Sequence, residues 1–135
     1  MVEITIRYEG DLRCVATHGP SGTVMQTDAP VDNMGKGESF SPTDLVATAL
    51  GTCILTILGI VSQRSGIPIA GATIKVTKDM TAQPPRRIAR LGVTVNIPQK
   101  LTYEQKQRLI NAADTCPVKK SLHSEIEVPM QWNWG

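Results

Sequence analysis

The spacing of apolar and polar residues predicts three strands and an ordered loop in the first third of the chain. Apolar and polar residues alternate over residues 2–8, and the turn EGD leads into a second strand at 12–17. The turn HGPSG precedes a third strand at 23–27. The segment DAPVDNMGKGESFSP then combines proline, glycine and other turn-forming residues, which indicates an ordered loop before a helix.

A long apolar helix is predicted to begin after Ser41. Ser41 is a suitable N-cap, Pro42 loses no hydrogen bond at the first helical position, and the carboxylate of Asp44 faces the positive end of the helix. The apolar pattern continues to residues 63–64, before a glycine and a proline. Because this helix is apolar nearly all round, every face of it has to be covered. The predicted strands of a 135-residue chain are able to cover only one side of this helix. The pattern therefore predicts a homodimer with the central helices packed inside it.

The second half of the chain predicts three further strands and a second helix. The strands are at 72–78, 87–97 and 125–132. Thr102 and Gln105 resemble a capping box, and Cys116-Pro117 either ends the second helix or starts another short one. The apolar side of the second helix comprises Tyr103, Leu109, Ile110 and Ala113. The order β-β-β-α-β-β-α-β predicts an α+β fold in one domain, residues 1–135.

Composition and charge exclude several classes of protein. Hydrophobic residues make up 41% of the chain and charged residues 19%, which is typical of a globular protein with a mainly aliphatic core. The net charge of +2 is too balanced to indicate a nucleic acid or a membrane surface as a partner. The charge-free run at 45–63 is interrupted by threonine and serine, which favours a buried core helix over a membrane span. With no secretory signal visible, we expect a cytoplasmic location.

The three cysteines are the main candidates for chemistry. In the cytoplasm such thiols are more often free or redox-active than structurally bridged. Cys53 lies in the middle of the apolar helix, where an inert packed thiol is the simplest interpretation. Cys116 lies before Pro117, where the amide groups of a helix N-terminus stabilise a thiolate, and Lys119 and Lys120 add positive charge. Cys14 is predicted to be an ordinary strand residue, with the formation of mixed disulfides as the alternative.

Metal and cofactor sites are not indicated by the spacing of the histidines and cysteines. Cys14 with His18 and Cys116 with His123 are the available pairs, and neither has the usual spacing of zinc ligands. A Cys-His nucleophile pair for acyl transfer lacks an evident third orienting group. We therefore predict no cofactor and no metal.

Two segments resemble a known family. FSPTDLVATALGTC, followed near the C-terminus by CPVKKSLH, resembles the OsmC/Ohr family of osmotically induced and organic-hydroperoxide-resistance proteins, most closely its general OsmC-like branch. The resemblance covers essentially the whole chain. It implies an OsmC-like α+β fold and an intertwined homodimer with active sites at the interface.

The resemblance also implies a function and the residues that perform it. In the family, the helix cysteine attacks an organic hydroperoxide, the Cys-Pro cysteine condenses with the resulting sulfenic acid, and a small dithiol such as dihydrolipoamide reduces the disulfide. Carried onto this sequence, Cys53 is peroxidatic and Cys116 is resolving. The apolar setting favours hydroperoxides with apolar tails but disfavours a thiolate, so a cation has to offset the desolvation.

The identity of that cation differs from the Ohr pattern. Ohr proteins use an arginine in an early turn, held by a glutamate after the helix proline, but here Thr43 takes the place of the glutamate. The turn HGPSG has no arginine, so His18 and Arg13 are the candidates. Asp44 is nine residues before Cys53 and on the opposite face of the helix, so it either caps its own helix or serves the Cys53 of a partner subunit.

A second function of a different class stays open. The same pocket suits a binding protein for a small hydrophobic or electrophilic molecule, without turnover. The missing family arginine and glutamate motivate this alternative.

Overall fold

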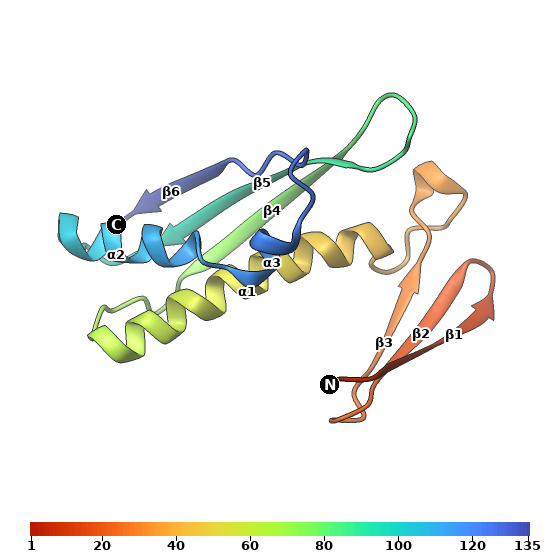
Figure 1. The fold of residues 1–135 in the computed structure, drawn as a ribbon, viewed down its shortest axis with the longest axis horizontal. Coiled ribbons are helices and arrows are strands. Elements are labelled where there is room, and N and C mark those ends of the chain that lie inside the picture. Colours follow the sequence, from red (N-terminus) through yellow and green to blue (C-terminus); the bar gives the residue numbers. More distant parts are fainter. The chain divides into compact units, whose positions relative to one another are not determined.

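The computed structural model describes all 135 residues and forms two compact units, Met1–Val46 and Ala47–Gly135. The six strands and the two longer α-helices follow the predicted order, a third, short helix starts after Cys116, and the α+β fold class is confirmed (Figure 1). The organisation as one domain stays a prediction, and the two units are described one after the other.

The first unit contains a three-stranded antiparallel sheet in the order β1-β2-β3. Its strands are β1 (Ile4–Gly10), β2 (Arg13–His18) and β3 (Val24–Asp28). The loop after β3 contains a short 3-10 turn at Val31–Asn33 and leads to the first helix. One face of β1 is apolar and uncovered within the chain, since Ile4, Ile6 and Tyr8 alternate along the strand and are all exposed. The N-terminal sheet therefore has little core of its own.

Helix α1 (Pro42–Ser65) begins as the sequence predicts. The Ser41 hydroxyl accepts a hydrogen bond from the Asp44 amide at 3.1 Å, and the Asp44 carboxylate accepts one from the Ser41 amide at 2.9 Å. These reciprocal bonds form a capping box that satisfies two backbone donors at the start of the helix. At the other end, Gly66 follows with a φ of 67°, a left-handed conformation that glycine adopts without strain.

The second unit contains a mixed sheet with helices on one face (Figure 1). Strand β4 (Thr73–Met80) pairs with β5 (Ile88–Ile97) in antiparallel fashion, and β6 (Met130–Trp134) pairs with β5 in parallel. Helix α2 (Tyr103–Ala113) and the short helix α3 (Pro117–Ser121) lie between β5 and β6 in the sequence. Thr102 and Gln105 form the predicted capping box at the start of α2.

The core of the second unit lies between α1 and the sheet. Four alternate residues of β5 face inward and are almost completely buried, whereas the opposite face of the sheet is polar. Gly51 lets α1 approach β4 closely, because a Cβ atom at this position would lie 3.0 Å from a methyl carbon of Val76. The buried apolar side chains of β5 and α1 are Leu91, Val93, Val95 and Ile97, and Ala47, Leu50, Ile54 and Leu58.

Two details differ from the sequence predictions. The last strand begins at Met130 and not near residue 125, because Pro129 has no amide hydrogen to donate to the ladder. Tyr103, predicted on the apolar side of α2, is largely exposed, whereas Leu109 and Ala113 of the same helix are buried. The first residue of a helix lies at its end, where the helix no longer covers the sheet.

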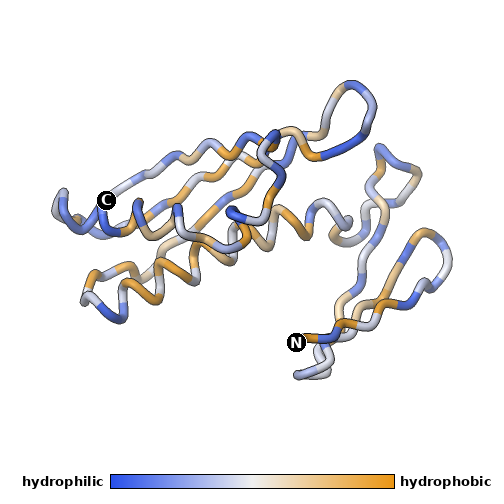
Figure 2. The backbone as a smooth tube through the Cα atoms, in the orientation of Figure 1, coloured by the Kyte–Doolittle hydropathy of each residue, from blue (hydrophilic) through white to orange (hydrophobic).

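Helix α1 is apolar all round but buried along only one stripe. Its apolar residues are visible along the whole helix in Figure 2, and its buried residues recur at helical spacing. By length and composition the helix is able to cross a membrane, with a mean hydropathy of 2.2 over 18 residues. The core helix of a soluble protein passes the same test, and the stripe of α1 is part of such a core. The rest of its apolar surface, including Ile60, is left uncovered within the chain.

Candidate functional site

Cys53 and Cys116 lie next to each other in the second unit, as the family resemblance implies. Cys53 is half-buried on α1, and Cys116 is completely buried just before α3. Burial raises the pKa of Cys116, and hydrogen bonding with the neighbouring Cys53 thiol raises it further. Cys116 is therefore held as a neutral thiol beside Cys53, and both thiols are free of disulfides.

The local sequence around Cys116 fixes its position. Cys116 is the N-cap of α3, and its sulfur accepts a hydrogen bond from the Lys119 amide at 3.4 Å. Pro117 occupies the first position of the helix, where no amide hydrogen is needed. The predicted positive charge of Lys119 is engaged elsewhere, because its ammonium group pairs with Asp114 at 2.7 Å. The backbone of α3, not the lysine side chain, thus provides the polar contact to Cys116.

An uncharged groove of about 430 Å³ borders Cys53. The hydroxyl of Thr52 donates to the carbonyl of Thr48 at 2.8 Å, so it is already satisfied within the helix. Such a surface favours apolar ligands over charged ones, since it offers no ionic partner. The lining residues are Ala49, Thr52, Cys53, Thr56, Ile57, Pro117 and Val118.

Arg13, one of the two predicted cations, is tied to carboxylates within the first unit. Its guanidinium lies 2.7 Å from the Glu38 carboxylate and 3.7 Å from that of Asp28. The hydrogen bond and the charge of Glu38 raise the pKa of Arg13 above its ordinary value. Asp28 is almost completely buried at the end of β3 and also accepts a hydrogen bond from the Glu38 amide. The cluster holds two carboxylates against one cation, so Arg13 is not a free positive charge.

His18, the other predicted cation, is held differently. Its side chain is half-buried at the end of β2, and its Nδ1 atom lies 2.6 Å from the hydroxyl of Ser21. The Nε2 atom makes no hydrogen bond within the chain, so this side of the ring is available for another partner. His18 has no carboxylate neighbour like those of Arg13.

Asp44 and Cys14 take structural positions. The carboxylate of Asp44 is part of the capping box of its own helix, which confirms one of the two predicted roles.

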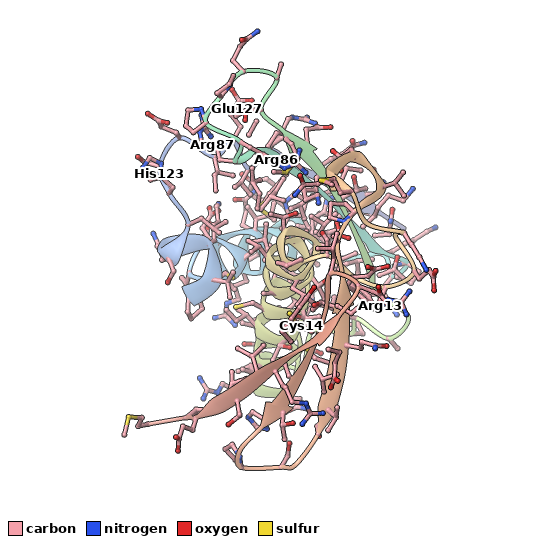
Figure 3. The ribbon with its side chains drawn as sticks, turned by 90° about the vertical axis from the view of Figure 1, so that its right-hand side faces the viewer. Arg13, Cys14, Arg86, Arg87, His123 and Glu127 are labelled. Atoms are coloured by element: carbon pink, nitrogen blue, oxygen red, sulfur yellow. The ribbon has the colours of Figure 1, made fainter.

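Cys14 lies on β2 beside Arg13, opposite Tyr8 and Thr27 (Figure 3). Because neighbouring strand residues point to opposite faces of a sheet, Cys14 shares a face with Tyr8 and not with Arg13. Cys14 is therefore the strand residue that the sequence predicts.

Three polar residues of the first unit were not singled out from the sequence. Asp28 and Glu38 bind Arg13, and Ser21 binds His18. Ser21 lies in the segment HGPSG, which indicates a turn but not the direction of its side chain. Asp28 ends a strand, and a polar residue at a strand end ordinarily indicates exposure. The burial of Asp28 is explained by the tertiary structure alone, in which its carboxylate lies near Arg13 and accepts a hydrogen bond from the Glu38 amide.

With the cysteine pair in place, comparison with known proteins shows the family. The family model described as "OsmC-like protein" matches residues 35–131. The chain belongs to the OsmC-like family. The matched residues include Cys53 and Cys116 but neither Arg13 nor His18. No significant match is found among curated proteins.

Solved structures with the same fold include members of the OsmC-like family under different names. A protein of Psychrobacter arcticus 273-4, described as an osmotic stress induced and detoxification response protein, is 45% identical, with 98% of this chain and 96% of that chain covered and a TM-score of 0.92. An organic hydroperoxide resistance protein from Elizabethkingia anophelis is 19% identical, with coverages of 100% and 96% and a TM-score of 0.80. OhrB of Bacillus subtilis is 20% identical, with coverages of 98% and 98% and a TM-score of 0.72. The last two likenesses show the fold alone.

Proposed function

We propose that the protein is a thiol-dependent peroxidase that reduces organic hydroperoxides. The observation that carries the proposal is the proximity of the Cys116 and Cys53 thiols at the edge of an uncharged groove. Two thiols in contact, one reachable from a groove and one buried, suit a peroxidatic and a resolving cysteine. The apolar lining suits a hydroperoxide with an alkyl or aryl tail. We expect this chemistry to take place in the cytoplasm, where small thiols keep the pair reduced.

The proposed reaction proceeds in three steps. The Cys53 thiolate attacks the distal oxygen of the hydroperoxide, so that an S–O bond forms, the O–O bond breaks, and the alkoxide leaves as an alcohol after gaining a proton. The Cys116 sulfur then attacks the sulfenic acid of Cys53, which forms a disulfide and releases water. A small dithiol, for which dihydrolipoamide is a candidate, reduces the disulfide and is itself oxidised. No metal or cofactor takes part.

The raised pKa of Cys116 supports this division of roles. A thiol that stays protonated does not compete for the hydroperoxide, because the thiolate is the nucleophile. Cys116 becomes a nucleophile only in the second step, after Cys53 has been oxidised.

We also propose that His18 supplies the positive charge that makes Cys53 reactive. The two predicted candidates differ in their surroundings: two carboxylates surround Arg13, whereas the Nε2 side of His18 is unbonded. An arginine that is already neutralised contributes little to a thiolate. Asp44 is occupied as a helix cap and carries the wrong sign of charge.

Stopped-flow measurement of peroxide consumption tests the proposed function. The wild-type protein with cumene hydroperoxide and excess dihydrolipoamide should turn over many times, and Cys53→Ser should lose this activity by at least about 100-fold because the nucleophile is gone. Cys14→Ser serves as the matched control and should keep full activity. Equally slow consumption by the wild-type protein and Cys53→Ser would reject the peroxidase.

The uncharged surface of the groove also supports a second candidate, a binding protein for a small hydrophobic or electrophilic ligand. Such a protein holds its ligand at Cys53 without turning over peroxide. Tight binding of an apolar ligand by both the wild-type protein and Cys53→Ser, without consumption of peroxide, would favour this function.

The uncovered apolar surfaces support the proposed homodimer. The N-terminal sheet exposes Ile4, Ile6 and Tyr8, and α1 exposes Ile60 away from its buried stripe. Apolar surfaces of this kind on a folded protein mark places where another subunit packs. A second copy of the same chain is the partner that the sequence predicts.

We expect light scattering at micromolar concentration to give twice the mass of one chain. Ile60→Glu should shift the equilibrium toward the monomer, because a buried and unpaired charge is costly at an interface. Thr73→Glu, on the polar outer face of β4, is the matched control and should remain dimeric. A stable folded monomer of the wild-type protein would refute the dimer.

A further inference from the structure

We infer that the reductant attacks the sulfur of Cys53 and not that of Cys116, so that its mixed disulfide forms on Cys53 and Cys116 leaves as the thiolate. The inference rests on the proposed function in one respect, the disulfide between the two cysteines. All the residues that carry it belong to the second unit, Ala47–Gly135.

The two sulfurs differ in their access to an incoming thiol. Cys53 is half-buried and lines the groove of about 430 Å³, whereas Cys116 is completely buried and does not line it. On the side of α3 the groove is lined by Pro117 and Val118, the two residues that follow Cys116. A thiolate reduces a disulfide by direct attack on one of its sulfurs, so it has to reach that sulfur. The groove therefore directs an incoming thiol to Cys53.

The position of Cys116 at the start of α3 suits a leaving thiolate. Its sulfur accepts a hydrogen bond from the Lys119 amide at 3.4 Å, and a charged sulfur is a stronger acceptor than a neutral one. Hydrogen bonds from the backbone of Lys119 and Val118 lower the pKa of Cys116, while burial has the larger effect and raises it. A raised pKa slows the departure of Cys116, whereas a sulfur that no thiol reaches is not attacked at all. Access therefore decides which sulfur receives the reductant.

The proposed reduction consists of two thiol–disulfide exchanges. A thiolate of the dithiol attacks the Cys53 sulfur, the bond between Cys53 and Cys116 breaks, and its electron pair goes to the Cys116 sulfur, which then takes up a proton. The second thiolate of the dithiol attacks the reductant sulfur of the mixed disulfide, and Cys53 leaves as the thiolate. The dithiol ends as a cyclic disulfide, oxidised by two electrons, and both cysteines are reduced. The hydroperoxide and the reductant thus reach the same sulfur through the same groove.

Thiol exchange with a disulfide that is formed without peroxide tests the inference. The disulfide is made in the full-length Cys14→Ser protein with diamide, which takes two electrons and two protons from a pair of thiols. A limiting amount of 2-mercaptoethanol is then added, acid stops the exchange after short times, and the free thiols are alkylated before peptide mapping. We expect the 2-mercaptoethanol adduct on Cys53 to exceed the adduct on Cys116 by at least about tenfold.

The same exchange in urea is the control for burial. Both sulfurs are exposed in the unfolded protein, so the adduct should appear on the two cysteines in comparable amounts. The same preference for Cys53 in urea would show that burial is not its cause and would overturn the inference.

Lys119→Gln is the matched control for charge. This substitution keeps the backbone amide and removes the ammonium group, which pairs with Asp114. We expect the position of the adduct to be unchanged and the rate of exchange to stay within about twofold of the wild-type rate, because an exposed charge is largely screened. A larger decrease in the rate would overturn the assignment of the leaving-group contact to the backbone of α3.

The mapped position of the adduct separates this inference from the proposed function. An adduct mainly on Cys116 of the folded protein, or equally on both cysteines, would overturn the inference. Failure of diamide to link Cys53 to Cys116 would overturn it as well, because the inference needs this bond. A selective adduct on Cys53 in a protein that consumes no hydroperoxide would reject the peroxidase and retain the inference, whereas turnover of hydroperoxide with the adduct on Cys116 would do the reverse.

Discussion

Cys116→Ser should reduce one equivalent of hydroperoxide per chain at the wild-type rate, consume a second as Cys53 is over-oxidised, and then stop. The first step needs only Cys53, whereas the second needs a sulfur at position 116 to form the disulfide. Without it, the Cys53 sulfenic acid persists and a second molecule of peroxide converts it to sulfinic acid, which a dithiol does not reduce. Steady-state turnover should therefore fall by at least about 100-fold, with the burst retained. Stopped-flow kinetics and the mass of the Cys53 peptide measure both quantities.

Serine is a suitable replacement because it preserves the structure around α3. Its hydroxyl is a good N-cap and is able to take over the hydrogen bond from the Lys119 amide. In the wild-type protein, one equivalent of hydroperoxide should link Cys53 to Cys116 within one chain, as detected by peptide mapping. Cys14→Ser should form the same link. Sustained turnover by Cys116→Ser would show that Cys116 does not resolve the sulfenic acid.

Leu50→Ala should cost about 2–5 kcal/mol of the free energy of unfolding. Leu50 is completely buried on the stripe of α1 that faces the core, next to the close contact between Gly51 and Val76. Alanine keeps the helix propensity but removes apolar contacts and leaves a cavity between the helix and the sheet. Urea denaturation followed by circular dichroism measures the loss, which is a large fraction of the stability of a typical domain.

The matched control for this substitution is Gln63→Ala on the same helix. Gln63 is exposed, so its replacement should change the free energy of unfolding by no more than about 0.5 kcal/mol. Comparable losses for both variants would contradict the assignment of the core to the stripe that contains Leu50.

The local parts of the fold were predictable from the sequence because their causes are local. Alternation of apolar and polar residues located the strands of the first sheet, and the capping residues Ser41 and Thr102 located the starts of α1 and α2. Each of these signals acts over a few residues, through the backbone and the nearest side chains. The late start of β6 was not predicted, because only the parallel pairing with the distant strand β5 shows that position 129 has to donate an amide hydrogen, which Pro129 lacks.

The candidate site was predictable only in part. Cys53 and Cys116 could be named because two segments resemble a family, but residue types and spacing by themselves favoured an inert thiol at position 53. Their contact arises from the packing of the second unit, which brings α1 and the start of α3 together. The carboxylate partners of Arg13 likewise come from a strand end and a loop, and no periodic pattern relates them.

The sequence by itself therefore determined the order of the elements, the caps of the two longer helices, the all-round apolar character of α1 and the candidate cysteines. The tertiary structure decided which thiol is buried and which candidate cation is already paired with carboxylates. The physical reason is that secondary structure depends on neighbouring residues, whereas burial, a pKa and an ion pair depend on atoms that only the folded chain brings within a few ångströms.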